Sequence, residues 1–520
     1  MKPISDKPKA GLISGERYLS LQALEVNAGR AATALHNIGV WKGDTVALLL
    51  RNDFAYFEAT QAAAKLGATT VALNWHMTPA EIAYILNDCD AKILIGHSDL
   101  LTEAVLAVLE DREVITVETP YEIALAYKVA PHLCNAPATI PEWYRWIGSF
   151  ESWTGPAQPP TAPMFYTSGT SGLPKGIKRK PIDPEVAQRA SLRSIKAWGL
   201  DQENIVSIMT GPLYHSAPNA YGMNLIRNGG LLILQPRFDA REMLELIEYY
   251  QVTHLHMVPT MFNRLLKLPD STRDSADVTS LKHVAHGAAP CPPDVKEAMI
   301  SWWGPVIYEY YALTETGIIA TCASEDWLKH PGTVGRAVEG IDIKIMDQSY
   351  KPCDTGEDGQ ICVKSETTPF VSYHRLEEQT QAMHWGDYIK TGDVGHQDGD
   401  GFLFISDRLS DMVISGGVNI YPAEIEKVLI TMPEITDCAV FGMPDDEYGE
   451  RLVAAVEGSE KLSKASVTEF LSERLAGYKV PREYHFDLDL PREDSGKIKK
   501  RLLKELLLSS GNQRAHASEK

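Results

Sequence analysis

Short apolar runs alternate with segments of helical periodicity in the first hundred residues of the chain. Residues 45–50 form an apolar run that predicts a buried strand, and the apolar positions of residues 54–66 repeat at helical spacing. Further strands are predicted at residues 70–73 and 92–95. Between these two strands, Thr78-Pro79-Ala80-Glu81 has the residue types of a capping box, which marks the start of a helix. This order is typical of a parallel sheet.

The same alternation resumes after residue 204. We predict a helix at residues 242–250 and strands at residues 205–209, 231–234, 254–258, 283–286 and 306–310. Such alternation favours parallel sheets with helices on both faces. Between residues 331 and 404, Gly and Asp turns separate short strands, which indicates a small antiparallel sheet.

After residue 408 the pattern indicates a compact unit of helices and strands. The fold class that we predict is therefore α/β. A large N-terminal domain, residues 1–407, has doubly wound, mostly parallel sheets plus a small antiparallel sheet. A small mobile α+β domain, residues 408–520, follows it. The length of 520 residues fits this division, since about two to four domains are expected for such a chain.

Charge and composition narrow the classes of function. The chain has 50 Lys plus Arg against 69 Asp plus Glu, a formal charge of −19, which disfavours nucleic acid as a partner. Its 7 cysteines are scattered without a C-x-x-C pair, so we expect reduced thiols in a cytoplasmic protein. No stretch approaches the about 18 apolar residues that span a bilayer. Peripheral contact with a membrane, and the choice between monomer and homodimer, stay open.

The most informative segment is glycine-rich and runs Tyr166-Thr-Ser-Gly-Thr-Ser-Gly-Leu-Pro-Lys-Gly-Ile-Lys-Arg179. Its glycines allow the backbone N–H groups to approach an anion, its hydroxyls add donors, and Lys175 adds positive charge. Polyphosphate is the ligand that suits this chemistry. The spacing differs from that of the G-x-x-x-x-G-K-[ST] loop. A flexible serine-glycine linker is the alternative, but it leaves Pro174-Lys175-Gly176 unexplained.

Four further motifs follow along the chain. They are Tyr311-Ala-Leu-Thr-Glu315, Tyr388-Ile-Lys-Thr-Gly-Asp393, Asp407-Arg408 with Ile414-Ser-Gly-Gly-Val-Asn-Ile-Tyr-Pro422, and Pro491-Arg-Glu-Asp-Ser-Gly-Lys497. With the glycine-rich segment, they resemble the acyl-adenylate-forming superfamily, which includes acyl-CoA ligases, firefly-type luciferases and peptide adenylation domains. The resemblance extends over residues 18–507 and points to the acyl-CoA synthetase branch.

The resemblance implies a two-step reaction that uses ATP, Mg²⁺ and CoA. The carboxylate of an acid attacks the α-phosphate of ATP to form an acyl adenylate, and the thiol of CoA then takes the acyl group. Two anions meet in the first step, so the site needs cations and fixed dipoles. The residues that the resemblance assigns to the nucleotide and CoA are Thr167, Ser168, Gly169, Ser171, Gly172, Lys175, Gly287, Ala288, Ala289, Tyr311, Ala312, Thr314, Asp393, Arg408, Gly416 and Gly417.

Individual roles follow from the same resemblance. Glu315 and Thr170 are expected to hold Mg²⁺, because magnesium prefers oxygen ligands. Tyr311 offers a flat face to adenine, and Asp393 binds the ribose together with Arg408. The alternatives for these residues are a buried aromatic strand for the tyrosine and solvated surface charges for the others.

Lys497 is expected to be the catalytic cation of adenylation, with Thr170, Glu315 and His215 as the other catalytic residues. Lys497 also fits a solvated basic helix face, and only the preceding turn and the motif single it out. Its distance in sequence from the other motifs requires the C-terminal domain to close over the large one. A second pose would bring Gly416 and Gly417 to the thiol. The expected hinge departs from the family pattern, with Leu409-Ser410 ahead of Asp411.

The acid is expected to bind beside Pro212-Leu-Tyr-His215. His215 could gate the carboxylate, or it could be an ordinary structural histidine. No aspartate stands here to pair with an α-ammonium group, so a fatty, aromatic or polycyclic acid is expected and not an amino acid. Ala312 adds one methyl group where the family often has glycine. The expected lining residues are Tyr214, Ala217, Met223, Val258, Thr260 and His286.

The function that we predict is an ATP-dependent carboxylic acid:CoA ligase. Two alternatives stay open at this point. The acyl group could pass to a carrier protein instead of CoA, or the chain could be a nucleotide-binding or acyl-binding regulator without turnover.

Overall fold

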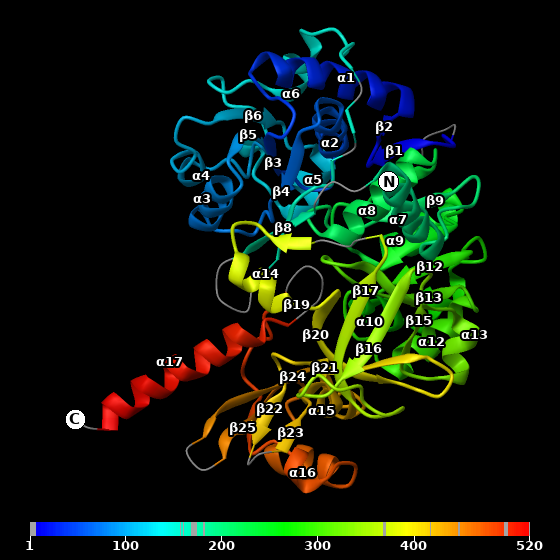
Figure 1. Cartoon of the computed structure of the whole chain (residues 1–520), viewed down its shortest axis with the longest axis vertical. Coiled ribbons are helices and arrows are strands. Elements are labelled where there is room, and N and C mark those ends of the chain that lie inside the picture. Colours follow the sequence, from blue (N-terminus) through cyan, green and yellow to red (C-terminus); the bar gives the residue numbers. More distant parts are fainter. Residues whose placement is uncertain are drawn as a thin grey trace.

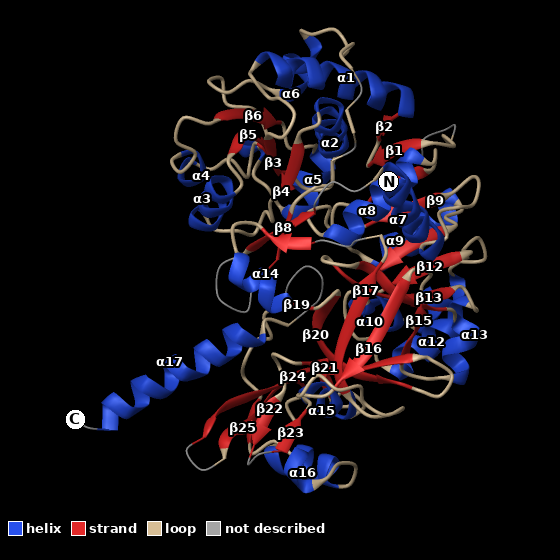
Figure 2. Cartoon of the chain, viewed as in Figure 1, coloured by secondary structure: helices blue, strands red, loops and turns tan. Residues whose placement is uncertain are grey.

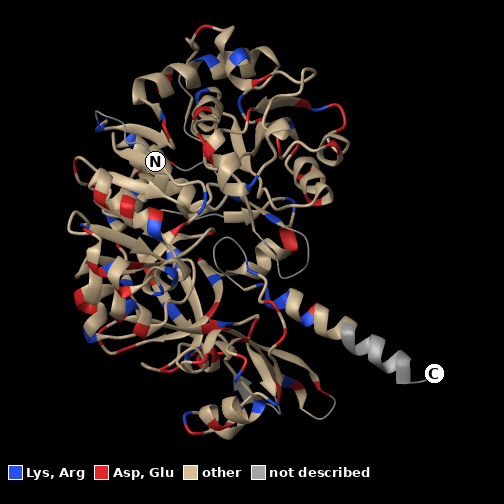
Figure 3. Ribbon diagram, turned by 180° about the vertical axis from the view of Figure 1, so that it is seen from behind, with Lys and Arg blue, Asp and Glu red and all other residues tan. Residues whose placement is uncertain are grey.

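The computed structural model describes residues 7–156, 158–159, 161–167, 174–179, 183–367, 371–415, 418–445, 448–492 and 498–518. Figure 1 shows a small sheet near the N-terminus at the top, a large sheet in the middle and a C-terminal unit at the bottom. Positions of acidic and basic residues are interspersed along the ribbon of Figure 3. Among the described residues, no helix combines the length and the apolar character that crossing a bilayer requires.

The first unit is a parallel sheet with the strand order β4-β3-β5-β6. Its strands are β3 (Thr45–Leu49), β4 (Thr69–Ala72), β5 (Ala91–His97) and β6 (Glu113–Val117), and its main helices are α1 (Leu21–Asn37), α2 (Phe54–Leu66) and α3 (Pro79–Asp88). The predicted capping box is confirmed, since the Thr78 side chain accepts from Glu81 N and the Glu81 side chain accepts from Thr78 N. The predicted strands and helices of this region exist, with ends shifted by a few residues.

Helices cover both faces of this sheet, as doubly wound topology requires. Val46 and Leu48 of β3 lie in one core cluster with apolar residues of α1 and α2. Ala47 and Leu49 lie in another cluster with Ile82 and other residues of α3. Successive side chains of a strand point to opposite faces, so one continuous apolar run serves both layers.

The central sheet has 14 strands in the order β16-β17-β20-β21-β15-β14-β13-β12-β11-β9-β10-β1-β2, with β19 paired to β20. Its strands are β1 (Gly11–Ser14), β2 (Arg17–Leu19), β9 (Val206–Met209), β10 (Leu231–Leu234), β11 (His254–Met257), β12 (His283–His286), β13 (Ile307–Leu313), β14 (Gly317–Cys322), β15 (Thr333–Ala337), β16 (Ile341–Met346), β17 (Gly359–Ser365), β19 (His384–Trp385), β20 (Tyr388–Gln397) and β21 (Leu403–Arg408). The pairs from β1–β10 to β12–β13 are parallel, whereas those from β13–β14 to β16–β17 are antiparallel. The antiparallel strands predicted after residue 331 therefore continue the parallel sheet through the β14–β15 pair.

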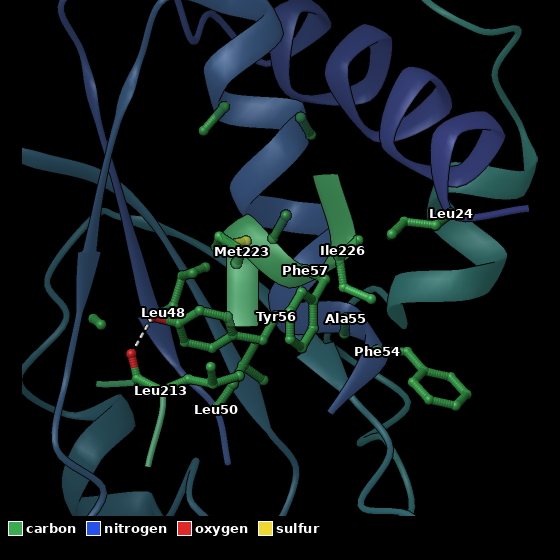
Figure 4. Close-up of a cluster of buried hydrophobic side chains, with 14 of the residues drawn as sticks. Leu24, Leu48, Leu50, Phe54, Ala55, Tyr56, Phe57, Leu213, Met223 and Ile226 are labelled. Carbon is green, nitrogen blue, oxygen red and sulfur yellow. Dashed lines mark hydrogen bonds between the residues drawn. The ribbon is translucent and has the colours of Figure 1, made fainter. Parts of the chain in front are cut away.

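Helices also cover both faces of the parallel strands (Figure 2). On one side lie α7 (Pro184–Ala197) and α8 (Ser216–Arg227), and on the other lie α9 (Ala240–Tyr250), α10 (Pro259–Leu266) and α12 (Pro293–Trp303). Figure 4 shows that Tyr56 of α2 packs close to Met223 of α8, with a hydrogen bond of 2.8 Å from Tyr56 Oη to the Leu213 carbonyl. The first sheet is thereby packed against the central sheet through a shared core.

A three-stranded sheet, β18-β8-β7, lies beside the first unit. It consists of β7 (Phe165–Thr167), β8 (Lys175–Arg179) and β18 (Val371–Tyr373). The remaining helical segments of the large part are α4 (Glu103–Leu106), α5 (Tyr121–Tyr127), η1 (Pro131–Leu133), α6 (Trp143–Gly148), α11 (Asp270–Ser275), α13 (Ser324–Lys329) and α14 (Glu377–Met383). Two stretches more than a hundred residues apart in sequence thus meet in one small sheet.

The C-terminal unit has its own sheet and its own core. Its elements are β22 (Val413–Ser415), β23 (Val418–Ile420), α15 (Pro422–Leu429), β24 (Ile435–Asp445), β25 (Gly449–Gly458), α16 (Lys464–Ser472), η2 (Gly477–Lys479), β26 (Glu483–His485) and α17 (Lys500–Ser518). Ala423 N donates to Asp407 Oδ2 at 2.9 Å, which ties α15 to the end of β21. The predicted division between residues 407 and 408 falls at the last residue of β21, and it stays a prediction.

Candidate functional site

The glycine-rich segment connects two strands that pair side by side. In the β7–β8 pair, Thr167 stands opposite Lys175, and Tyr166 stands opposite Gly176. A Cβ at Gly176 would come within 2.8 Å of the Tyr166 ring, so this position requires glycine. Thr167 and Lys175 both line a large cavity. The predicted phosphate residues between them, Ser168, Gly169, Thr170, Ser171 and Gly172, lie outside the described residues.

Glu315 lies beside the same hairpin. Tyr373, at the end of β18, donates its hydroxyl hydrogen bond to Glu315 Oε1 at 3.0 Å. The ammonium nitrogen of Lys175 lies 5.1 Å from the centre of the Tyr373 ring. Burial, and then the charge of Glu315, raise the pKa of Tyr373. Tyr373 therefore stays protonated, and it links the Glu315 carboxylate to β8, the strand that begins with Lys175.

The turn between β13 and β14 presents Thr314 and Glu315 to the cavity. The Thr314 hydroxyl lies 3.1 Å from the hydroxyl of Ser216, the first residue of α8. Arg179 donates to the Thr314 carbonyl at 2.7 Å. Thr314, the first residue of this short turn, is thus fixed by groups from β8 and α8.

Tyr311, Asp393 and Arg408 form one group that is joined by a hydrogen bond and an ion pair. Asp393 stands opposite Arg408 in the β20–β21 pair, and Arg408 Nε lies 3.3 Å from Asp393 Oδ1. The Tyr311 hydroxyl donates to Asp393 Oδ2 at 2.5 Å. Tyr311 and Asp393 are buried, and only Arg408 of the three lines the cavity. The ring of Tyr311 does not present the open adenine face that we expected, because β-sheet neighbours and Asp393 enclose it.

The residues after β12 adopt an unusual backbone. Ala288 has φ +67°, in the left-handed region that a residue with a Cβ enters at an energetic cost. A Cβ at Gly287 would lie 2.6 Å from the Tyr310 carbonyl oxygen, so the backbone here packs directly on β13. Ala288 lines the cavity, whereas Gly287 and Ala289 do not. Strained backbone of this kind is often found at binding sites.

Most of the predicted acyl residues share one wall of the cavity. The lining residues include Tyr214, His215, Ala217, Met223, Val258 and Ala312. The Tyr214 ring packs between the rings of Trp75 and His215, with centres 4.7 and 4.5 Å away. His215 immediately precedes α8, at its N-cap position.

Two of the predicted acyl residues lie elsewhere. Thr260 and His286 are absent from the described cavity lining. The His286 ring is fully buried in the opposite layer, 5.1 Å from the Phe262 ring. The reason is the two-residue period of a strand: Ala285 faces the layer of α8, so His286 faces that of α10 and α12.

The cavity has a volume of about 2330 Å³ and includes residues of both parts of the chain. Arg492, Ile498, Lys499 and Lys500 contribute from the C-terminal unit, as do Leu409, Ser410 and Asp411 of the predicted hinge. Leu409 N donates to the Gly392 carbonyl at 2.8 Å, which continues the β20–β21 pairing into this turn. Lys497, Gly416 and Gly417 lie outside the described residues.

Sequence reasoning gave no role to several residues of this cavity, among them Arg179, Arg193 and Tyr373. Arg179 is the last residue of the glycine-rich segment, and its charge could have been considered with that of Lys175. Tyr373 follows no motif, and only the pairing of Tyr373 with Ile177 reveals its place beside Glu315. Arg193 stands in an ordinary amphipathic helix, so its orientation depends on the packing of α7.

Comparisons with known proteins identify the family of the chain. The chain matches the AMP-binding enzyme family over residues 5–371 and the C-terminal domain of AMP-binding enzymes over residues 424–497. Long-chain-fatty-acid–CoA ligase FadD13 of Mycobacterium tuberculosis is 31% identical over 495 residues, 94% of this chain and 92% of the relative. The 2-succinylbenzoate–CoA ligase of Bacillus licheniformis is 31% identical over 497 residues, 94% of this chain and 95% of the relative.

A solved structure extends the likeness to the fold. The o-succinylbenzoate CoA synthetase of Bacillus subtilis, in complex with its acyl-adenylate intermediate, has a TM-score of 0.80 and 27% identity. The match covers 95% of each chain. The predicted α/β fold and the predicted family are both confirmed. The chain therefore belongs to the AMP-binding enzyme family and is an AMP-forming enzyme of its acyl-CoA synthetase branch.

Proposed function

We propose that this enzyme joins a fatty, aromatic or polycyclic carboxylic acid to CoA in two steps. The observation that carries the proposal is the convergence on one cavity of Lys175, Glu315, Arg408 and the segment after Lys497. Cations and a carboxylate from four separate parts of the chain meet there. This is the arrangement that two reacting anions require.

In the first step, a carboxylate oxygen of the acid bonds to the α-phosphorus of ATP, and the bond to pyrophosphate breaks. Lys175 and the glycine-rich hairpin bind the β- and γ-phosphates, and Thr314 donates to the α-phosphate. Lys497 bridges the acid carboxylate and the α-phosphate oxygens. The position of Ile498 and Lys500 on the cavity supports this role, because Lys497 directly precedes them.

The residues around Glu315 fit a magnesium ion. Its carboxylate faces the cavity and is fixed by the Tyr373 hydroxyl, and Thr170 is the second protein ligand that we propose. Magnesium prefers carboxylate and phosphate oxygens. When bound, the ion would neutralise phosphate charge, while Tyr373 keeps Glu315 oriented.

For the nucleoside, we propose that Asp393 accepts from the ribose hydroxyls beside Arg408. Adenine would lie against the backbone of residues 287–289. Because Tyr311 is enclosed and holds Asp393 by a hydrogen bond, the role that we propose for it is to orient this carboxylate. This role differs from the adenine contact that the resemblance implies for Tyr311.

In the second step, the CoA sulfur bonds to the acyl carbon, the bond to AMP breaks, and the thiol proton leaves. Gly416 and Gly417 would line the path of the pantetheine arm after rotation about residues 409–411. Glycines permit close approach of a thin ligand to the backbone. We place this reaction in the cytoplasm.

The acid is the least determined part of the proposal. The two relatives named above act on long-chain fatty acids and on 2-succinylbenzoate, so both aliphatic and aromatic acids belong in a screen. The mainly apolar wall of Tyr214, Ala217, Met223 and Val258 supports such substrates. An apolar pocket discriminates between acids that differ by one methylene by only about 1 to 3 kcal/mol, so the acids that react are to be ranked by kcat/KM.

The test is a panel of acids with ATP, Mg²⁺ and CoA, followed by acid-dependent release of pyrophosphate, AMP and thioester. We expect at least one acid to give all three products. Lys497→Ala should slow adenylation on the order of 100- to 1000-fold, since one charged group at the reacting centre is lost. Lys504→Ala, on α17 but off the cavity, is the matched control and should retain activity.

Two outcomes would replace the proposal by its alternatives. If the acyl adenylate accumulates and CoA never takes it, the acceptor is a carrier protein. If ATP binds and no acid releases pyrophosphate, the chain acts as a regulator without turnover.

A further inference from the structure

One guanidinium group in the cavity has no counter-ion among the residues that the structure describes. Arg193 lies on α7 and lines the cavity. Its Nε and Nη1 atoms are buried, and neither has a hydrogen-bond partner among the described residues. An arginine is always charged at physiological pH, so this charge is held in the fold without compensation.

The electrostatic surroundings of Arg193 are unfavourable for a cation. Burial, and then the positive charge of Arg179, lower the pKa of Arg193, and no described carboxylate opposes them. Burying a charge without a partner destabilises the fold. A charged group that is kept in a cavity despite this cost in stability is a candidate for binding a ligand of opposite charge.

The position of Arg193 indicates what kind of ligand it meets. Its Nη2 atom lies 3.9 Å from where a Cβ of Gly317 would stand, so the side chain extends from α7 over the start of β14. The other cavity residues of α7 are mostly small, namely Pro184, Ala187, Gln188, Ala190, Ser191 and Ser194, and Trp198 follows directly after the helix. They continue the wall of α8 that carries Ala217 and Met223.

We propose that Arg193 binds a second anionic group of the acid, a carboxylate distant from the one that reacts. The substrate class is then a dicarboxylic acid with an apolar body. This inference rests on the proposed function, since it concerns the acid that is adenylated. The planar guanidinium fork suits a carboxylate, which can take two parallel hydrogen bonds from it.

The triphosphate of ATP is the competing anion. In the proposed function, Lys175 and Thr314 bind the phosphates from the glycine-rich segment and the β13–β14 turn. Arg193 lies near Arg179 of β8, but it extends from α7, whose cavity residues adjoin those of α8. A second carboxylate therefore fits its place better than a phosphate, and the kinetics can separate the two.

The experiment compares acids paired by length, hexanoate with adipate, octanoate with suberate and decanoate with sebacate, and includes the monomethyl ester of suberate. The ester keeps the shape of suberate and removes the distal charge. For wild type we expect a higher kcat/KM with the diacids than with their partners. Arg193→Met should lower kcat/KM for the diacids on the order of 100-fold and leave the monoacids and the ester nearly unchanged.

The matched control is Arg189→Met, which removes the same charge from an exposed position of the same helix. It should preserve the preference of wild type. Equal kcat/KM for diacids and monoacids in wild type would overturn the inference and leave the proposed function intact. So would an Arg193→Met variant whose KM for ATP rises, or whose kcat falls equally for all acids. A wild type that activates no acid contradicts the proposed function itself.

Discussion

Two cations beside the central sheet differ in whether a carboxylate of the fold pairs with them. Lys296, on α12, is fully buried, and its ammonium nitrogen lies 2.6 Å from Glu309 Oε2. It also lies 5.0 Å from the centre of the Trp327 ring. Arg193, on the opposite layer, has buried nitrogens and no partner among the described residues.

The difference separates a structural charge from one available to a ligand. Lys296 has its counter-ion, Glu309, within the fold. His286 stands opposite Glu309 in the neighbouring strand. Burial, and then the charge of Lys296, keep the pKa of His286 well below its usual range. That histidine stays neutral, so the pair is complete. Arg193 faces a cavity that can admit an anion. Removing each cation should therefore have opposite consequences for stability.

The largest expected effect is on the complete pair. Lys296→Met leaves the buried Glu309 carboxylate without its partner and should lower the free energy of unfolding by about 3 to 5 kcal/mol. Urea unfolding followed by fluorescence measures the loss. In the double variant Lys296→Met/Glu309→Leu much of the stability should return, because no unpaired charge remains. A single variant as stable as wild type would contradict the structural role of the pair.

A second prediction concerns His256, a buried base whose partner is also in the fold. Its ring lies 2.8 Å from the Tyr310 hydroxyl, and burial lowers the pKa of His256 to about 4. Above pH 6.5 the histidine is neutral in both states and its effect is constant. Below about pH 6.5 the unfolded chain binds a proton that the folded chain refuses, so stability falls until about pH 4.

Between pH 6.5 and pH 5 this loss is roughly 2 kcal/mol for His256 alone. His256→Gln should remove that part of the pH dependence, as urea midpoints across the range would show. His132→Gln, at an exposed position, should keep the slope of wild type. An unchanged slope in His256→Gln would mean that the folded protein admits the proton.

The smallest expected effect has the opposite sign. Arg193→Met replaces a half-buried charge that has no partner among the described residues by an apolar side chain, so it should leave stability unchanged or raise it by up to about 1 kcal/mol. The melting temperature without ligand measures this change. A fall as large as that expected for Lys296→Met would show that Arg193 has a structural partner, and the contrast between the two cations would then be lost.

Periodicity and capping residues were sufficient for most of the secondary structure. The strand at Thr45–Leu49 and the helix at Phe54–Leu66 follow from local apolar spacing, and the capping box at Thr78 forms as predicted. The family follows from motif residues whose spacing does not depend on packing. The side of a strand on which a residue points was harder to predict, as His286 shows.

The sequence alone predicted a parallel α/β architecture, a glycine-rich phosphate-binding segment and the motifs of an acyl-CoA synthetase. Those features depend on neighbours only a few positions apart. Only the tertiary structure brought Tyr373 to Glu315, enclosed Tyr311 with Asp393, and left Arg193 without a partner among the described residues. Contacts between residues so distant in sequence depend on sheet pairing and helix packing, which no local pattern encodes.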